Sequence, residues 1–266
     1  MRVLALAPLM FYCAIHVTGI TQDSASQPNP QPKSPVVVEL FTSEGCSDCP
    51  PADDLLSAMA QHSTTAALAD LNIIPLSFHV TYWDEQGWHD RFDDARYTER
   101  QRDYQSQFHI PSIYTPQSVI DGQYETVGNS AQKVIGLIRR AAAEPKPVEV
   151  EISASTDSVM VTAHTTNDKA TGKVLLAVTE DGLTTEVKAG ENRSKTLHHN
   201  AVVRSLEDLG RLKNGAFSRT VSLKLKKEWQ RDKLHLIVLV QENNGHVLGA
   251  GTTVLSSAAT TAQMRR

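Results

Sequence analysis

Cys46 and Cys49 are the residues of this 266-residue chain whose types and spacing could do chemistry. Two cysteines separated by two residues can form a disulfide that exchanges with other thiols and disulfides. The attacking species in such an exchange is a thiolate. Cys46, the first cysteine of the pair, would attack a substrate, and Cys49 would resolve the mixed disulfide. The third cysteine, Cys13, lies in an N-terminal apolar run. The spacing therefore predicts a redox pair at Cys46 and Cys49.

Three other interpretations of the pair compete with redox chemistry. A structural bridge over two intervening residues closes a very small loop, which in the chain-entropy treatment contributes roughly 2 kcal/mol, against more than about 4 kcal/mol for a long loop. A metal site would need one or two ligands besides the two thiolates, and His79 or His89 could supply them. The spacing could also be a coincidence.

The N-terminal residues indicate the compartment in which the cysteines lie. Residues 1–20 contain Arg2 followed by an apolar run from Val3 to Ile15, which is typical of a secretory signal peptide or, if it is not removed, of an anchor. Residues 21–35 are rich in Gln, Ser and Pro and predict a disordered linker. We therefore expect export to the periplasm or the extracellular space, where a disulfide persists.

The segments on either side of the pair predict how it is positioned. The β-branched run Val36–Phe41 is typical of a buried strand, and Leu55–Leu71 follows a helical pattern that comes after two prolines and two aspartates. Both sulfurs would then lie at or just before a helix N-terminus. Free backbone N–H groups at that position stabilise an anion and would favour a thiolate at Cys46.

The rest of the N-terminal half predicts a second strand and a hairpin. Leu71–Val80 is typical of a buried strand, and a polar, aromatic insertion occupies residues 81–110. Two short runs around an Asp-Gly turn predict a hairpin over Ser118–Val127. Asn129 and the Gln three residues later resemble a capping box for a last helix.

The C-terminal half has a different pattern. Apolar and polar residues alternate in several short runs between turn signals, which predicts an all-β sandwich-like domain over residues 148–256 and a tail over 257–266. Ser205–Leu212 is the one stretch with a helical pattern. His198 and His199 could be ligands, but exposed strand or loop histidines are more common. We expect this domain to be a binding or docking module.

The order of strand, C-x-x-C, helix, strand, insertion, Thr-Pro, hairpin and helix resembles the thioredoxin superfamily. In that superfamily the proline of the Thr-Pro pair is cis and lies against the active-site disulfide. The resemblance implies that Pro116 is cis and that Thr115 and Pro116 shape a substrate groove. It also implies the fold class: an α/β thioredoxin-like domain over residues 36–145, with a helical insertion, followed by the all-β domain.

A second resemblance is narrower. The segments ELFTSEGCSDCPPAD, HVTYWDEQGWHDRF and YTPQ are similar to landmarks of a bacterial exported family, the domain of unknown function 1223. The resemblance covers most of residues 36–255. It supports the fold more than a function, because function depends on the site and the family name carries no activity.

Charge excludes some partners and predicts how the redox pair is tuned. A net charge of −4 favours neither nucleic acid nor an anionic membrane, and the mature chain has no apolar run long enough to span one. Five acids and no Lys or Arg lie between Ser34 and His62. Acids such as Asp48 would raise the pKa of the Cys46 thiol, which predicts a reductant or an isomerase-like couple. His79 and Trp83 are further candidates for tuning.

The sequence thus predicts a thiol–disulfide oxidoreductase that acts on a protein or small-thiol substrate. It would need no dissolved cofactor and no metal, and glutathione or a protein reductant could donate its electrons. One alternative is a non-enzymatic binding protein with a permanently oxidised disulfide, which would act through its C-terminal domain or through His79, Tyr82 and Trp83. Another is copper handling by Cys46, Cys49 and His79, because two thiolates suit a soft metal.

Overall fold

The computed structural model describes residues 34–62, 67–167 and 169–255. The predicted signal peptide or anchor over 1–20 and the predicted tail over 257–266 lie outside the described residues, as does nearly all of the predicted linker. The described residues belong to one compact unit. Within the described part of the chain, no helix combines the length and the apolarity that crossing a bilayer requires.

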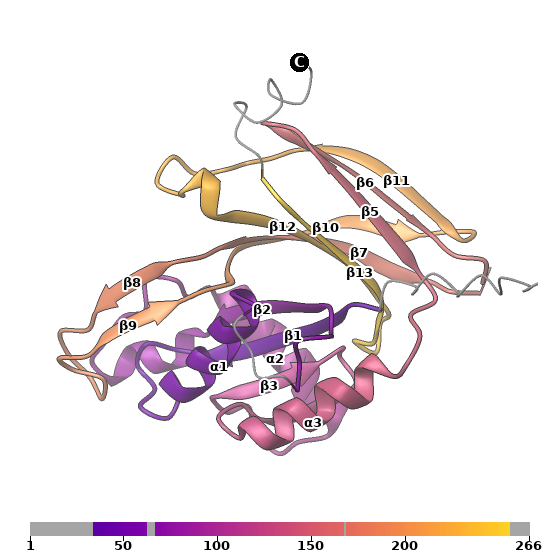
Figure 1. Cartoon of the computed structure of the whole chain (residues 1–266). Coiled ribbons are helices and arrows are strands. Elements are labelled where there is room, and N and C mark those ends of the chain that lie inside the picture. Colours follow the sequence, from indigo (N-terminus) through magenta and orange to yellow (C-terminus); the bar gives the residue numbers. More distant parts are fainter. Residues whose placement is uncertain (1–33, 63–66, 168, 256–266) are drawn as a thin grey trace, which may run out of the picture. The chain divides into compact units, whose positions relative to one another are not determined.

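The N-terminal half combines helices and strands (Figure 1). They are β1 (Val36–Thr42), α1 (Pro50–Ala60), β2 (Ile73–His79), the 3-10 helix η1 (Thr81–Gln86), α2 (Ala95–Phe108), β3 (Gln117–Ile120), β4 (Tyr124–Val127) and α3 (Ala131–Ala142). The two predicted strands and the hairpin are therefore present, and the insertion over 81–110 contains η1 and α2.

The C-terminal half is built from strands. They are β5 (Glu149–Ala154), β6 (Ser158–His164), β7 (Gly172–Glu180), β8 (Leu183–Glu186), β9 (Thr196–His199), β10 (Val202–Leu212), β11 (Ala216–Ser222), β12 (Leu234–Gln241) and β13 (Val247–Val254), with the 3-10 turn η2 (Arg231–Lys233) before β12. Strands β11, β6 and β5 form a three-stranded sheet, and β8 pairs with β9 in a separate two-stranded sheet.

The large sheet joins the two halves of the chain. Its eight strands follow the order β13-β12-β7-β10-β2-β1-β3-β4. The junction is the parallel pairing of β10 with β2, where Val202 lies opposite Ser77 and the Ser77 N–H donates to the Ala201 carbonyl at 2.8 Å. A hydrophobic cluster crosses the same junction and packs Phe78 and Tyr97 with Leu239.

The expected fold class, an α/β thioredoxin-like domain followed by an all-β sandwich-like domain, is wrong. The chain is mostly β, and strands from both halves share one mixed sheet of eight strands. Hydrophobic patterns identified most of the strands, but they do not identify strand partners. Pairing between β2 and β10 depends on backbone groups more than a hundred residues apart in the chain, which local periodicity does not report.

The predicted helical stretch Ser205–Leu212 is also wrong, because it belongs to strand β10. The pairing of β10 with β7 shifts register between Val203 and Ser205 and again between Asp208 and Gly210. Each such irregularity, as in a β-bulge, inserts a residue and breaks the alternation of a strand. Apolar residues then recur every three positions, at Leu206, Leu209 and Leu212, which imitates a helix.

Strand register brings three loops to one edge of the sheet. Strands β1 and β2 are parallel, with Thr42 opposite His79, so the loops that follow them leave the same edge. Strand β3 runs antiparallel to β1 and begins at that edge, with Gln117 opposite Phe41. The cysteine loop after β1, the η1 loop after β2 and the Thr-Pro loop before β3 therefore meet.

Candidate functional site

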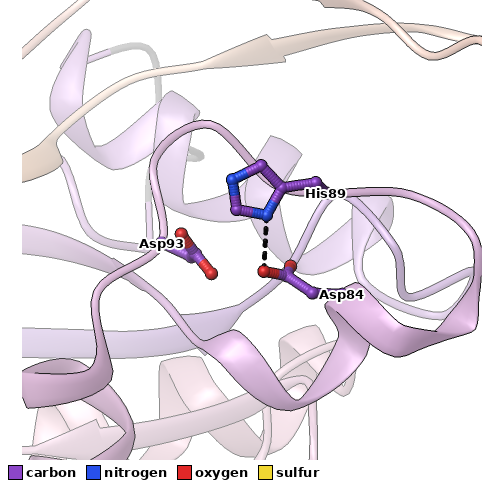
Figure 2. Close-up of side chains that lie close together, drawn as sticks. All are labelled: Asp84, His89 and Asp93. Carbon is purple, nitrogen blue, oxygen red and sulfur yellow. Dashed lines mark hydrogen bonds and ion pairs between the residues drawn. The ribbon is translucent and has the colours of Figure 1, made fainter.

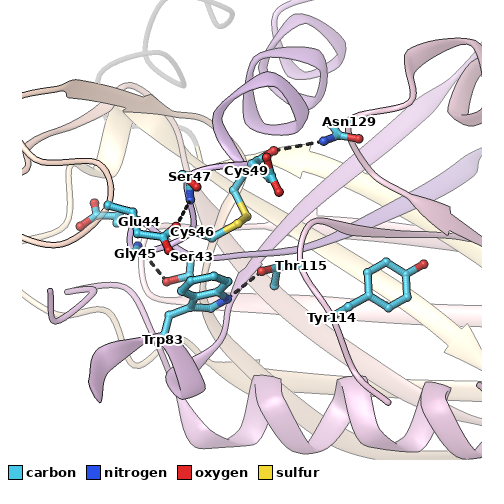
Figure 3. The surroundings of a disulfide bond; sticks show 12 residues. Ser43, Glu44, Gly45, Cys46, Ser47, Cys49, Trp83, Tyr114, Thr115 and Asn129 are labelled. Atoms are coloured by element: carbon cyan, nitrogen blue, oxygen red, sulfur yellow. Dashed lines mark hydrogen bonds between the residues drawn. A yellow bond between two sulfur atoms is a disulfide. The ribbon is translucent and has the colours of Figure 1, made fainter. Parts of the chain in front are cut away.

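Cys46 and Cys49 form a disulfide at this edge, with their Cα atoms 5.4 Å apart (Figure 3). Both residues are almost completely buried, with exposed fractions of 1% and 0%, whereas Ser47 and Asp48 between them are exposed. The Cys46 N–H donates to the Ser43 carbonyl at 3.1 Å, which closes the loop after β1. The protein surface near the disulfide is thus formed by Ser47 and Asp48, which lie between the two cysteines.

Helix α1 begins directly after the disulfide, with Cys49 as its N-cap. Pro50 and Pro51 have no N–H group, and the N–H groups of Ala52 and Asp53 both donate to the Cys49 carbonyl, at 2.9 and 3.1 Å. The helix start therefore stabilises a Cys46 thiolate less than the sequence suggested, because its first donors are missing or already bound.

The Thr-Pro loop and Trp83 lie beside the disulfide (Figure 3). The Thr115–Pro116 peptide bond is cis, as the resemblance implied. Trp83, in η1, donates its Nε1–H to Thr115 Oγ1 at 2.7 Å and so ties the η1 loop to the Thr-Pro loop. A side chain at Gly45 would place its Cβ 3.1 Å from the Trp83 Cβ, so the two loops would have to move apart by a few tenths of an ångström to accept one.

A segment that sequence analysis assigned to the C-terminal domain also contacts the disulfide loop. This segment, Leu183–His199, contains β8 and β9 and is called the arm below. Asn192 of the arm is fully buried and donates its Nδ2 hydrogens to the carbonyls of Glu44 and Cys46, at 2.9 and 2.8 Å. Glu191 accepts a hydrogen bond from the Ser47 N–H at 3.1 Å. The arm therefore holds the backbone on which the redox pair sits.

Four titratable side chains are buried behind the loop. They are Glu44, His79, Asp90 and His199, each no more than 2% exposed. Asp90 Oδ2 accepts from the Glu44 N–H at 2.8 Å and lies 2.6 Å from His79 Nδ1. Burial raises the pKa of Asp90, but the combined effect of His79 and two backbone N–H groups is larger and lowers it overall. His79, a predicted tuning residue, thus connects to the cysteine loop through Asp90.

The buried position of His199 differs from the expectation of an exposed strand histidine. Its Nε2 lies 3.3 Å from Glu44 Oε1, and its ring centroid is 5.1 Å from that of His79. Glu44 is also held by Trp88, whose Nε1–H donates to Oε2 at 2.9 Å. The two adjacent histidines did not indicate this position, because nothing local shows that the arm packs against α1 and the loop after β1.

A second cluster supports the Asp90 loop from the surface side (Figure 2). Asp84, His89 and Asp93 each offer one ligand atom, all within 4.8 Å of one another. Asp84 accepts a hydrogen bond from the Asp90 N–H at 3.2 Å and lies 2.6 Å from His89 Nδ1. Partial burial and the neighbouring Asp84 raise the pKa of Asp93 to about 7. The sequence suggested His89 as a ligand of a metal held by the two cysteine thiolates. In the structure its Nδ1 is instead hydrogen-bonded to Asp84.

The five acids predicted to surround Cys46 occupy different environments. Glu39 is buried and forms an ion pair with Arg100 at 2.6 Å. Asp48 and Asp54 are exposed, and Asp48 accepts a long hydrogen bond from Asn129 through its backbone carbonyl. Asp53 is 6% exposed. The influence of Asp48 on the Cys46 thiol stays a prediction, and the burial of Asp53 was not indicated by the sequence.

The comparisons with known proteins place the chain in a family. The family model described as Protein of unknown function (DUF1223) matches residues 37–241, and the chain belongs to this family. The fold is similar to the crystal structure of protein AGR_C_4864 from Agrobacterium tumefaciens, with a TM-score of 0.70 and 24% identity, covering 86% of this chain and 97% of that chain.

A second solved structure is also similar. It is HBP35 of Porphyromonas gingivalis, with a TM-score of 0.60 and 16% identity, covering 84% of this chain and 76% of that chain. No curated protein matches the sequence. At these identities the two structures support the fold alone, so the chemistry of the site must be argued from its residues.

Proposed function

We propose that this protein is an exported thiol–disulfide oxidoreductase that uses Cys46 and Cys49. The observation that carries the proposal is the disulfide at the N-cap of α1, beside the cis Thr115–Pro116 loop and Trp83. This local arrangement resembles the active-site surroundings of the thioredoxin superfamily, although the complete fold differs. A bridge over two residues contributes little stability, which favours a chemical role over a structural one.

The proposed exchange has two steps. In the reduced protein the Cys46 thiolate attacks one sulfur of a substrate disulfide, and the other substrate sulfur leaves as a thiolate and takes up a proton. The Cys49 thiol then loses its proton and attacks the Cys46 sulfur, which releases the second substrate thiolate. The protein dithiol is oxidised to a disulfide and the substrate disulfide is reduced to two thiols, so electrons and protons balance.

The surroundings of the pair favour the reducing or isomerising direction. The start of α1 lacks two N–H donors, because Pro50 and Pro51 occupy its first positions. A thiolate at Cys46 is therefore less stabilised than at an ordinary helix start, and a strong oxidant depends on a stable thiolate in its reduced form. Glutathione or a protein reductant would return electrons to the pair, and protein or small-thiol disulfides would be the substrates.

Burial of both cysteines favours a second candidate function. A disulfide that no reductant can reach would be structural, and the protein would then act as a binding protein through another surface. Copper handling by Cys46, Cys49 and His79 is a weaker alternative, because His79 is already held by Asp90 and packs against Phe92.

The reduction potential of the pair separates the first two candidates. The oxidised protein would be equilibrated in graded dithiol buffers and its free thiols counted by alkylation and mass spectrometry. A potential between about −120 and −270 mV would support an exchange catalyst, whereas one below about −300 mV, or resistance to reduction until unfolding, would indicate a structural bridge. Catalysis of insulin reduction should be lost in Cys46→Ser, and equal activity of that variant would contradict the proposal.

A further inference from the structure

We infer that Asp53 and His199 form the proton-transfer site of the Cys46–Cys49 pair, with the histidine supplied by the arm. This inference rests on the proposed exchange reaction and assigns its second step to named groups. Neither residue was a candidate in the sequence for this role. Asp53 lies in the first turn of α1 and His199 ends β9, so the site exists only because the arm folds onto the helix.

Asp53 lies one helical turn after Cys49 in α1. The Cys49 backbone is already helical, with φ −79° and ψ −36°, so Asp53, four residues later, lies on the same face of the helix one turn further on. Asp53 Oδ1 is buried and has no hydrogen-bond partner within the described residues. A buried carboxyl oxygen without a partner is costly, and such groups gather at functional sites.

His199 is the second unpartnered group. Its Nδ1 and Nε2 are both buried without a hydrogen-bond partner in the described structure, although Nε2 lies within ion-pair distance of Glu44. Asp53 and His199 both line a cavity of about 370 Å³ between α1 and β9, together with Lys195 and His198. The cavity is large enough for several water molecules, which could carry a proton between the two side chains and the solvent.

Several charged groups act on Asp53 from the elements packed around it. His199 of the arm favours its ionised form, as does the Thr42 hydroxyl at the end of β1, while Asp54 on α1 and Asp90 in the loop after η1 oppose it. Burial is the largest effect, and together these influences raise the pKa of Asp53 to about 7. A group with that pKa can both accept and release a proton at neutral pH.

The proton path follows from these positions. When Cys49 attacks the mixed disulfide at Cys46, its thiol proton passes to the Asp53 carboxylate, and the new Cys49–Cys46 bond expels the substrate thiolate. Asp53 then loses the proton to solvent through the cavity and His199. The reverse sequence supplies a proton to Cys49 when the disulfide is reduced.

The test separates the two chemical steps. The reduced full-length protein would be mixed with dithiobis-nitrobenzoate, which releases one coloured thiolate when Cys46 attacks and a second when Cys49 resolves the mixed disulfide. The rate of the second release would be measured from pH 5 to 9 in the wild type, Asp53→Asn and His199→Gln. Asp103→Asn is the control, since it removes an exposed helical carboxylate from α2, away from the cavity.

The expected result is a wild-type second step that inflects near pH 7, with Asp53→Asn slower by about tenfold or more at pH 7 and lacking that inflection. His199→Gln should shift the inflection to higher pH, because a group that favours ionised Asp53 is removed. Asp103→Asn should retain the wild-type inflection to within a few tenths of a pH unit. First-release rates should be similar in all four proteins.

Two outcomes would overturn the inference. One of them leaves the proposed exchange function intact, and the other overturns that function as well. If Asp53→Asn resolves the mixed disulfide at the wild-type rate and with the wild-type pH profile, the proton-transfer role is wrong and the exchange function stands. If the folded wild-type protein cannot be reduced, so that no coloured thiolate is released, the exchange function is wrong and the inference falls with it. Thermal unfolding of each variant checks that a slow second step does not reflect misfolding.

Discussion

Two regions of the molecule, the disulfide edge of the large sheet and the space between the large and the three-stranded sheet, bury different kinds of side chain. At the disulfide edge, Glu44, Asp53, His79, Asp90 and His199 are buried together. Between the large sheet and the sheet of β5, β6 and β11, the core consists mainly of aliphatic side chains such as Val161, Leu176 and Leu236. Trp229 is buried in the same cluster. Burying charged groups opposes folding, whereas burying aliphatic groups drives it.

This difference assigns stability mainly to the aliphatic core and chemistry to the charged cluster. The aliphatic core stabilises the fold through apolar burial, which is non-directional and scales with buried area. The charged cluster must be held in place by specific hydrogen bonds, such as those of Asn192 and Asp90. Perturbed, buried titratable groups of this kind are more common at functional sites than in structural cores.

The largest effect is expected in the aliphatic core. Leu236→Ala removes a side chain that is completely buried between the sheets and should reduce the free energy of unfolding by about 2–5 kcal/mol. The reduction potential of the Cys46–Cys49 pair should not change. Urea denaturation and thiol equilibration would check both values, and a shifted potential would show that the two regions are coupled.

The next effect concerns the pH dependence of stability. The pKa of Asp53 is about 7 in the folded protein and 3.8 in an unperturbed carboxyl, so the folded state binds more protons between these values and the stability that Asp53 contributes is lost as pH rises. Asp53→Asn should therefore gain stability relative to the wild type between pH 4 and pH 8, by about 3–4 kcal/mol. Urea denaturation of both proteins at pH 4 and pH 8 measures their free energies of unfolding. A difference between variant and wild type that is the same at both pH values would contradict the prediction.

A comparable or smaller effect is expected at the arm. Asn192→Ala removes two hydrogen bonds to the backbone of the disulfide loop and should lower the free energy of unfolding by about 1–3 kcal/mol. Because the loop is less firmly held, the disulfide should also react several-fold faster with dithiothreitol. Ser194→Ala, in the same segment, serves as a control, and equal reduction rates in both variants would mean that the arm does not restrain the loop.

The smallest effect is expected at Asp48. This carboxylate is exposed, so its influence on the Cys46 thiol is screened by water. Asp48→Ser should lower the thiol pKa slightly and raise the reduction potential slightly. An alkylation-rate titration of the reduced protein would measure the pKa, and a large change would show that Asp48 acts at closer range than its exposure suggests.

Local sequence patterns predicted most elements of the N-terminal half and many of the C-terminal strands. The strands around Val38 and Leu76 and the hairpin at Asp121 follow from β-branched runs and turn residues, whose preferences act within a few residues. Strand β10 was missed because its irregular register imitated a helix. The capping box at Asn129 was also wrong, since Ser130 is the N-cap of α3.

The sequence by itself determined the cysteine pair and its place before a helix, because each depends on residues close together in the chain. The place of the Thr-Pro loop beside the pair was implied only by the resemblance to a known superfamily. Only the tertiary structure decided that β2 pairs with β10, that the arm reaches the disulfide loop and that His199 and Asp53 share a cavity. These contacts join residues more than a hundred positions apart. Their free energy comes from packing and hydrogen bonding in the folded state, and no local preference encodes it.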